Sequence, residues 1–342
     1  MLLHSSPYSI VQIVCGVDGD NPTAQEAQAL SDRKSFRWVT FVWTPFQFVF
    51  LIWCCWAFST YPIGMLDRVA FIISVGLNTG AIGINVSHEL IHRSEINEQR
   101  LGKCLLVMVC YAHWYIEHLR GHHKHVSTPH DPATARRGQT FYSFWWQSVS
   151  GTWRSAWHLE ATRLRKEGKQ TQCCVSVFPG LGVWSVHNEI VTLSLASVAL
   201  AAGTICVADT FIVVQASGMC WPVCAAVLEL VNFIEHWGLA RRLVGNDKLG
   251  KPRYEAVSVI HSWNADTKIT NLFLFKLQRH SDHHVMEGFI TAQAFASRRY
   301  QILRSFDNSP QMPTGYAGMI TMALVPPLWF HVMNPRVDAF MR

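Results

Sequence analysis

Long stretches without a single charged residue alternate with polar segments along the chain. A helix needs about 20 apolar residues to cross a hydrocarbon layer of roughly 30 Å, because each residue adds about 1.5 Å to its length. Four of the uncharged stretches are close to this length or longer. They predict membrane-spanning helices at about 38–60, 69–87, 190–208 and 210–228.

Two further uncharged stretches fit a spanning helix less well. The first, Cys104–Ile116, has the length of a re-entrant, interfacial or buried helix, so we expect that it does not cross the membrane. The second, Gly315–Met333, contains Pro326-Pro327, and proline interrupts a helix because it removes a hydrogen bond and clashes with the preceding turn. We therefore expect a structured tail in water or at the interface there, with a fifth span as the alternative.

The remaining segments are polar and are expected in water or at the membrane surface: 1–37, 88–189 and 229–342. The aromatic run Phe141–Trp146 predicts an anchor at the membrane interface, where Trp and Tyr side chains gather. It precedes a helix-like basic stretch with RLRK at Arg163–Lys166, which Gly168 is placed to end. We expect this basic face to contact solvent, anionic lipid headgroups or an acidic protein partner.

The orientation of these segments follows from the order of the spans. Two predicted spans precede His88 and two more precede Glu229, so 1–37, 88–189 and 229–342 lie on the same side of the membrane. Every Lys and Arg except Arg68 lies on that side. Because basic loops are retained in the cytoplasm, the sequence predicts that this side is cytoplasmic.

Composition supports a membrane protein with one large domain. Of its 342 residues, 49% are hydrophobic and only 15% are charged, which is apolar for a soluble chain. The ten cysteines contain no C-x-x-C pair, which argues against a disulfide scaffold and against a cysteine-bound iron site. The first residues lack the basic start and the cleavage site of a secretory signal peptide. We therefore expect a lipid bilayer and no nucleic acid as partner, and electrons for any redox reaction from another protein.

Nine of the seventeen histidines fall into four local groups that point to metal binding. HELIHR and EHLRGHH each contain a pair one helical turn apart, and HSDHH places three imidazoles on one face of a helix. Imidazole is a common ligand of transition metals, and one ion needs only three or four ligands, so the set predicts more than one ion. The nine are His88, His92, His118, His122, His123, His236, His280, His283 and His284.

An acid adjoins each histidine group: Glu89, Glu117, Glu235 and Asp282. We expect these carboxylates to accept the second ring N–H of a metal-bound imidazole, which fixes its tautomer. A direct bond from one of them to the metal is the alternative. HELIH also fits the H-E-x-x-H motif of zinc proteases, with Glu89 as general base. Seven further clustered histidines beside a membrane favour O2 activation on iron, because zinc cannot change its oxidation state.

The other histidines have simpler interpretations. His113 and His261 are expected to be structural. The rest are isolated or lie in polar segments and are expected to be solvated: His4, His125, His130, His158, His187 and His331.

These motifs resemble those of the integral-membrane alkane 1-monooxygenases, within the membrane fatty acid desaturase and hydroxylase superfamily. The resemblance covers the chain from about residue 30 to its end. HSWN followed by LQRHSDHH separates these enzymes from most desaturases. The motifs are HELIHR, EHLRGHHKHVSTPHDPATAR, RSAWHLEATRLRK, NFIEHWGL, HSWNADTKITNLFLFKLQRHSDHH, RRYQILRS and MPTGYAGMITMALVPPLWFHVM.

The resemblance implies an all-α polytopic membrane protein with about four spans and a helical cytoplasmic cap that carries a histidine-rich di-iron site. It implies that the nine histidines bind two non-haem iron ions. It also implies that the chain hydroxylates the terminal methyl of medium- or long-chain alkanes with O2 and with electrons from a separate rubredoxin. Because an alkane offers no group for hydrogen bonding, selectivity for its end requires an apolar channel, which the four spans would line.

The chain also departs from this pattern. From the resemblance we expect that an additional N-terminal transmembrane hairpin, which family members carry, is absent before residue 38. An apolar segment longer than usual, 285–297, follows the last three histidines. Leu119 stands where the family usually has Asn, and His130 where it usually has an acid. The alternatives are therefore a hydroxylase of aromatic methyl groups or fatty acyl chains, or an inactive, truncated relative.

Overall fold

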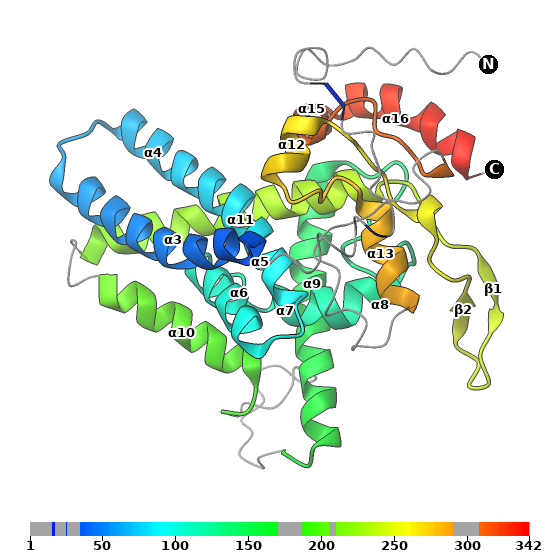
Figure 1. Cartoon of the computed structure of the whole chain (residues 1–342), viewed down its shortest axis with the longest axis horizontal. Coiled ribbons are helices and arrows are strands. Elements are labelled where there is room, and N and C mark those ends of the chain that lie inside the picture. The colour runs from blue at the N-terminus through cyan, green and yellow to red at the C-terminus, as the bar shows by residue number, and fades with distance from the viewer. Residues whose placement is uncertain are drawn as a thin grey trace. The chain divides into compact units, whose positions relative to one another are not determined.

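The computed structural model describes residues 16–17, 25, 35–169, 186–204, 210–289 and 308–341. The fold is mostly helical (Figure 1), as predicted. The chain divides into two compact units. Unit 1 contains Met1–Arg33, His122–Ser148 and Glu229–Arg342, and unit 2 contains Lys34–Gly121 and Val149–Leu228.

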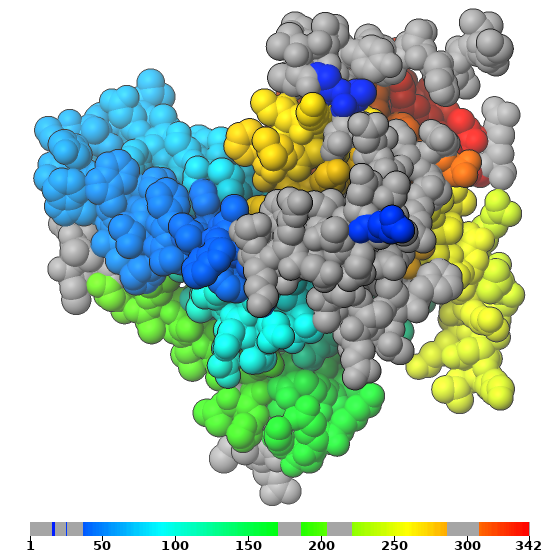
Figure 2. Space-filling view, in the orientation of Figure 1, coloured from blue at the N-terminus to red at the C-terminus, as the bar shows by residue number. Residues whose placement is uncertain are grey.

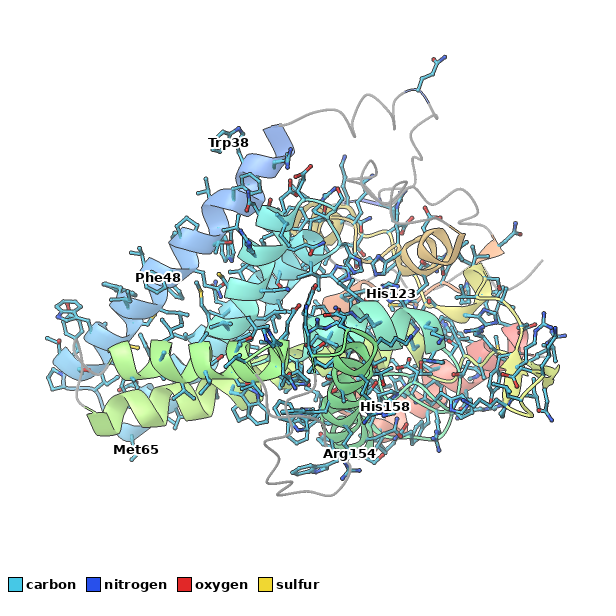
Figure 3. The ribbon with its side chains drawn as sticks, turned by 90° about the horizontal axis from the view of Figure 1, so that it is seen from below. Trp38, Phe48, Met65, His123, Arg154 and His158 are labelled. Atoms are coloured by element: carbon cyan, nitrogen blue, oxygen red, sulfur yellow. The ribbon has the colours of Figure 1, made fainter. Side chains whose placement is uncertain are left out.

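Unit 2 begins with two long apolar helices. The first is α3 (Ser35–Thr60); the second consists of α4 (Met65–Asn78), the π-helical turn η1 (Thr79–Gly83) and α5 (Ile84–Ile91), which follow one another without a break. Figure 3 shows Trp38 near one end of α3 and Met65 at the start of α4, beyond its other end. Both helices are long and apolar enough to cross a membrane, so the first two predicted spans are confirmed as helices of the required length.

The other two predicted spans correspond to α10 (Glu189–Thr204) and α11 (Thr210–His236). Residues 205–209, which contain the end of the third predicted span, lie outside the described residues. Helix α11 continues past the predicted end at Leu228 to His236. A histidine of the predicted metal site is therefore carried by the last turn of an apolar helix.

The stretch Cys104–Ile116 does not form one helix. It is divided between the end of α6 (Ile96–Met108), a turn, and the start of α7 (Trp114–Glu117). Tyr111, Trp114 and Ile116 are buried in the core of unit 2. The stretch therefore forms no single helix long enough to cross a membrane, and that it does not cross the bilayer stays a prediction.

Glycine allows α5 and α6 to approach closely. A Cβ atom on Gly102 would lie 2.8 Å from Cγ2 of Ile91 and 3.1 Å from both Cβ of Leu90 and the carbonyl oxygen of Ser87. The Ser87 hydroxyl donates a hydrogen bond to the Gly102 carbonyl oxygen at 2.8 Å. This crossing fixes the position of the helix that carries His88.

Unit 1 contains shorter elements. They are α8 (His123–His125), the first part of α9 (Phe141–Lys166), the last turn of α11, the 3-10 turn η3 (Val259–His261), α12 (Lys268–Phe273), α13 (His280–Phe289), α15 (Tyr316–Ala323) and α16 (Pro326–Phe340). An antiparallel hairpin, β1 (Leu243–Asn246) and β2 (Pro252–Tyr254), interrupts the helices. The sequence patterns had not predicted these strands.

The aromatic run at the start of α9 has two faces. Phe141 and Phe144 are buried and pack against Phe233, whereas Tyr142 and Trp146 are exposed. The prediction that this run serves only as an interfacial anchor was therefore wrong, because residues three positions apart lie on one helical face and enter the core of unit 1.

Two predicted helix boundaries are confirmed. Helix α9 ends before Gly168, which has a φ of 65°, a left-handed conformation that glycine adopts without strain. The stretch Gly315–Met333 breaks before Pro326, which begins α16 at a position where its missing N–H costs nothing. The two resulting helices have 8 and 15 residues, so the alternative of a fifth span there is wrong.

Two further predictions concern residues that the structure does not describe. The segment before residue 38 falls mostly outside the described residues, and so does the part of the apolar segment 285–297 after Phe289.

The α5–α6 crossing predicts a large effect of a small substitution. Gly102→Ala should destabilise the protein by about 1–3 kcal/mol, because its methyl group overpacks the contact with Leu90 and Ile91. Gly203→Ala on α10 is the matched control, since its Cβ would meet nothing within 4 Å. Thermal unfolding in detergent measures both; equal unfolding temperatures for the two variants would contradict the close approach.

Candidate metal centre

Three of the predicted histidines gather within unit 2. His88 lies on α5 and His92 follows it by one turn, so both rings lie on the same side of the helix. His118 begins the π-helical turn η2 (His118–His122), and its Nε2 lies 3.0 Å from Nε2 of His92. The indole of Trp114 stacks on the ring of His118 with centroids 4.3 Å apart. The three potential ligand atoms lie within 4.8 Å of one another.

Four more gather within unit 1, from three elements. His122 ends η2, His236 ends α11, and His280 and His284 lie one turn apart on α13. Nε2 of His280 lies 3.1 Å from Nε2 of His236 and 2.9 Å from Nε2 of His284. All four residues are buried, and their potential ligand atoms lie within 4.8 Å of one another.

The remaining two predicted histidines face each other beside this group. His123 is on α8 and His283 is on α13, and their Nε2 atoms are 3.1 Å apart. The ring of His284 lies 4.7 Å from that of His123 and 5.3 Å from that of His283, measured between centroids. Unit 1 therefore holds six of the nine predicted histidines, and unit 2 holds three.

These short nitrogen–nitrogen distances fit a bound metal ion. A neutral imidazole carries one N–H, so Nε2 of His280 cannot donate to two neighbouring nitrogens at once. For an imidazole–metal bond of about 2.1 Å, as in zinc sites, two nitrogens at right angles around one ion are about 3.0 Å apart. Burial also lowers the pKa of His236 to about 3 and that of His284 well below its usual value, so both rings are neutral, as metal ligands must be. The donor set thus matches a transition metal such as iron.

Asp131 orients one of these rings, although the sequence patterns did not single it out. Its Oδ2 accepts a hydrogen bond from Nδ1 of His122 at 2.9 Å, which leaves Nε2 of His122 as the metal-binding nitrogen. The Thr134 hydroxyl and the Ala133 N–H also donate to this carboxylate. Burial would raise the pKa of Asp131, but His122 and Thr134 outweigh it and hold the pKa below its usual value. No local spacing connects Asp131 with His122, so only the fold brings them together.

Glu235 contacts an imidazole at a different nitrogen from the one expected. Its Oε2 lies 3.3 Å from Nε2 of His280, the nitrogen that faces His236 and His284, and its Oε1 accepts a hydrogen bond from the Tyr316 hydroxyl at 2.5 Å. The expectation that Glu235 supports the outer ring nitrogen was therefore wrong for this contact. Burial raises the pKa of Glu235 to about 8 despite the Tyr316 hydrogen bond, so the metal-free carboxyl group is protonated at neutral pH. A cation in the group would favour the carboxylate, and Oε2 is placed to approach it.

The other three predicted acids have different surroundings. Glu89 forms an ion pair with Arg93, one turn further along the chain. Glu117 is buried and accepts a hydrogen bond from the Ser155 hydroxyl at 3.4 Å. Asp282 is buried on α13. Their predicted roles beside imidazoles stay predictions.

The remaining histidines mostly follow their expected interpretations. His261 is buried, and its Nδ1 accepts a hydrogen bond from the Ser258 N–H at 2.9 Å, which supports a structural role. His113 is buried as well. His125 is half-buried, and four others are exposed: His130, His158, His187 and His331. His4 lies outside the described residues.

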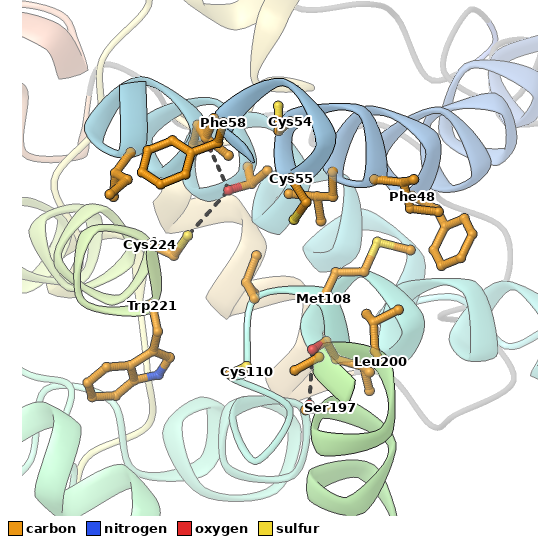
Figure 4. Close-up of a pocket in the computed structure, with 18 of the residues that line it drawn as sticks. Phe48, Cys54, Cys55, Phe58, Met108, Cys110, Ser197, Leu200, Trp221 and Cys224 are labelled. Carbon is orange, nitrogen blue, oxygen red and sulfur yellow. Dashed lines mark hydrogen bonds between the residues drawn. The ribbon is translucent and has the colours of Figure 1, made fainter. Parts of the chain in front are cut away.

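Unit 2 also contains an apolar pocket between α3, α4, α6, α10 and α11 (Figure 4). Its volume of ≈ 90 Å³ is several times the ~10–15 Å³ that one water molecule needs. Among the described residues that line it, two carry hydroxyl groups, and both hydroxyls donate hydrogen bonds to backbone carbonyl oxygens. Thr79 donates to the Val75 carbonyl oxygen at 2.8 Å, and Ser197 donates to the Val107 carbonyl oxygen at 3.0 Å. The pocket therefore suits a ligand that makes no hydrogen bonds.

Comparison with known proteins decides between the interpretations left open by the motifs. A family model described as fatty acid desaturase matches residues 65–321, which include all nine predicted histidines. The chain belongs to the fatty acid desaturase family. Membership of this family, together with the two long apolar helices, identifies an integral membrane protein. It also replaces the zinc-protease interpretation of HELIH.

Individual relatives agree with the resemblance of the motifs. Alkane 1-monooxygenase 1 of Pseudomonas aeruginosa is 41% identical over 97% of this chain and 80% of its own length. Alkane 1-monooxygenase 2 of Alcanivorax borkumensis is 38% identical over 97% of this chain and 80% of its own length. The hydroxylase component of xylene/toluene monooxygenase from Pseudomonas putida is 28% identical over 78% of this chain and 63% of its own length. The predicted resemblance to alkane 1-monooxygenases is thereby confirmed.

The contact between Asp131 and His122 predicts a measurable effect on metal binding. Asp131→Asn should weaken the affinity of the protein for iron(II) by about 10–100-fold, because the ring of His122 loses its charged acceptor. Asp338→Asn serves as the control, since this carboxylate forms an exposed ion pair with Arg137. Competition with a metal chelator measures the affinity. Equal affinities of the two variants would show that Asp131 does not support a metal ligand.

Proposed function

We propose that this chain is a membrane di-iron alkane 1-monooxygenase that hydroxylates the terminal methyl of medium- or long-chain alkanes. The observation that carries the proposal is the presence of two groups of buried or partly buried imidazoles and an apolar pocket in a chain that is 34–41% identical to several alkane 1-monooxygenases. The reaction inserts one atom of O2 into a C–H bond and reduces the other to water. It therefore needs electrons and protons in addition to the alkane.

Each imidazole group would hold one iron ion. His88, His92 and His118 would bind one ion. The second ion would be bound in unit 1 by His122, His236, His280 and His284, and His123 and His283 face each other beside this group. Iron would supply the activation of O2, which no side chain of the protein can supply. The turn η2 begins with His118 of one group and ends with His122 of the other, so the chain connects the two groups directly.

In this reaction the protein would position the metal-binding side chains and hold the alkane in an apolar pocket. Asp131 fixes the tautomer of His122 and holds its Nε2 toward the group. Tyr316 holds Glu235 at Oε1, so that Oε2 stays beside His280. The apolar pocket would hold the alkane chain by dispersion and by removal of apolar surface from water, without any polar group that would lose a hydrogen bond.

The membrane arrangement forms part of the proposal. Besides the two long apolar helices, α10 and α11 would cross the bilayer, so that the nine histidines emerge on the cytoplasmic side. Support for this orientation comes from the distribution of Lys and Arg, all of which except Arg68 lie in 1–37, 88–189 and 229–342, on the side of the histidines. An alkane dissolved in the bilayer would then reach the pocket without crossing water.

Aromatic methyl groups form the second candidate class of substrate. The observation in its favour is the relative from Pseudomonas putida that is named as a xylene/toluene monooxygenase component. The higher identity and greater coverage of the alkane 1-monooxygenases favour alkanes.

A separate rubredoxin would deliver the electrons, and the hairpin β1–β2 offers it a docking surface. The hairpin projects from the surface in Figure 2 and exposes Leu243, Val244 and Leu249. Four basic side chains lie on or beside these apolar residues: Arg242, Lys248, Lys251 and Arg253. An apolar centre with a basic rim is complementary to a small acidic redox protein.

Hydrogen bonds connect the end of this hairpin to a proposed iron ligand. Glu255, directly after β2, lies 3.2 Å from Nε2 of His261 through its Oε1. The carbonyl oxygen of His261 lies 3.4 Å from Nδ1 of His236. Electrons from a rubredoxin bound at the hairpin would therefore reach the metal group through a short series of contacts.

The proposed activity predicts a specific product. Iron-loaded protein with rubredoxin and its reductase should convert octane to 1-octanol in the presence of O2. A His236→Ala/His280→Ala variant should bring the rate to background, because it removes two nitrogens from one group. Chromatography of products from octane, p-xylene and dodecanoate separates the candidates. Faster turnover of p-xylene than of octane, or no oxygenated product at all, would overturn the proposal.

The docking surface predicts a charge effect on the electron donor. Lys248→Glu/Lys251→Glu should raise the KM for rubredoxin about tenfold at low salt and leave the rate at saturating rubredoxin nearly unchanged, because charge complementarity acts mainly on association. Arg165→Glu/Lys166→Glu on the exposed side of α9 is the matched control. A KM that is the same in both variants would show that rubredoxin binds elsewhere.

A further inference from the structure

A second pocket adjoins the apolar pocket within unit 2. Its lining includes His113, Val149, Trp153 and Arg154, and it shares Cys110 and Trp221 with the first pocket. In Figure 4, Trp221 lies on the side of the first pocket opposite Phe48. The volume of ≈ 630 Å³ lies within the ~300–1,000 Å³ typical of small-molecule sites. The two pockets therefore adjoin at Cys110 and Trp221.

The second pocket contains a buried polar atom without a protein partner. His113 is 5% exposed, and its Nε2 makes no hydrogen bond with the described residues. Its ring is held between Tyr111 and Trp153, with centroid distances of 4.4 Å and 4.9 Å. A buried imidazole nitrogen without a partner costs free energy, which a polar ligand in the pocket would recover. Burial lowers the pKa of His113 to about 3, so the ring is neutral and its N–H can donate.

The positively charged side chain of Arg154 lies at the same pocket. Arg154 is exposed on α9 (Figure 3), and no acidic group of the described chain forms an ion pair with it. Trp146 and Trp153 are exposed along the same helix. Arginine and tryptophan side chains favour the boundary between hydrocarbon and water, because each has an apolar body and a polar end. The headgroup of an amphiphile lies at this boundary, so the end of the pocket at Arg154 suits such a headgroup.

We infer that the joined pockets bind a long-chain fatty carboxylate, with its head between Arg154 and His113 and its alkyl chain between Cys110 and Trp221 into the apolar pocket. A carboxylate accepts hydrogen bonds at both oxygens, so one can pair with the guanidinium and the other with the imidazole N–H. The alkyl chain would lie against the same side chains that are proposed to hold an alkane. A fatty acid therefore competes with the alkane substrate.

This competition rests on the proposed function, but the binding does not. Terminal oxidation of an alkane yields an alcohol, and further oxidation by other enzymes yields the carboxylate of the same chain length. A site that binds both the alkyl chain and the carboxylate would slow hydroxylation when this acid accumulates.

The test measures binding of radiolabelled dodecanoate to the purified full-length protein in phosphatidylcholine nanodiscs, without O2 or reductant. We expect binding of one dodecanoate per chain. Arg154→Gln should weaken it about tenfold, because a charge-assisted hydrogen bond is lost. Arg165→Gln, an exposed arginine on the same helix, is the control and should leave it unchanged. His113→Phe, which keeps a ring between Tyr111 and Trp153, should also weaken binding. The affinity for 1-dodecanol should not respond to Arg154→Gln.

A second pair of variants tests where the alkyl chain lies. Ala201 lines the apolar pocket, and the next residue, Ala202, is exposed. Ala201→Phe should remove the preference for dodecanoate over hexanoate, and Ala202→Phe should retain it. Equal binding of dodecanoate to the wild type and Arg154→Gln would overturn the inference. So would displacement by phosphatidylglycerol together with tighter binding of dodecyl phosphate, which would identify a lipid headgroup site.

The outcome is distinguishable from failure of the proposed function. A chain that binds dodecanoate but does not oxidise octane leaves the inference standing. A chain that oxidises octane with a KM unaffected by dodecanoate contradicts it.

Discussion

The arrangement of the imidazole groups depends on the free-energy cost of burying ring nitrogens close together without a cation between them. In unit 1, Nε2 of His280 lies 3.1 Å and 2.9 Å from two other ring nitrogens in a buried group, and a neutral imidazole has only one N–H to donate. Without a cation, such an arrangement leaves lone pairs facing each other; with one, the same lone pairs become ligands. The elements that carry these rings are fixed accordingly, by the α5–α6 crossing at Gly102 and by the buried contacts of Asp131 and Tyr316.

The two pockets of unit 2 differ in whether their polar groups have hydrogen-bond partners within the described residues. The hydroxyls of Thr79 and Ser197 are satisfied by backbone carbonyls, so the first pocket suits a molecule without polar groups. Nε2 of His113 lacks a partner among the described residues and lies at the same pocket as Arg154, so the second suits a polar head. An alkane and the carboxylate of the same chain length differ in this one end. The inferred site would therefore bind both with the same apolar side chains around the alkyl chain.

Much of this arrangement could be predicted from local patterns. The uncharged stretches located α3 and the helix from α4 to α5, and the i, i+4 spacing of His88 and His92 placed both rings on one side of a helix. Contacts between distant segments could not be predicted in this way. Asp131 reaches His122 through an irregular turn, and Glu235 faces the inner nitrogen of His280 because α11 and α13 meet there. The short strands β1 and β2 are exposed throughout or nearly so, and therefore lack the alternation of a half-buried strand.

The most direct test of the account is the iron content per chain of the purified protein and of two variants, each of which removes two nitrogens from one group. The account predicts two iron ions in the wild type and one in each variant, His88→Ala/His92→Ala in unit 2 and His236→Ala/His280→Ala in unit 1. A wild type with a single iron, or a variant that retains two, would contradict the assignment of one ion to each imidazole group.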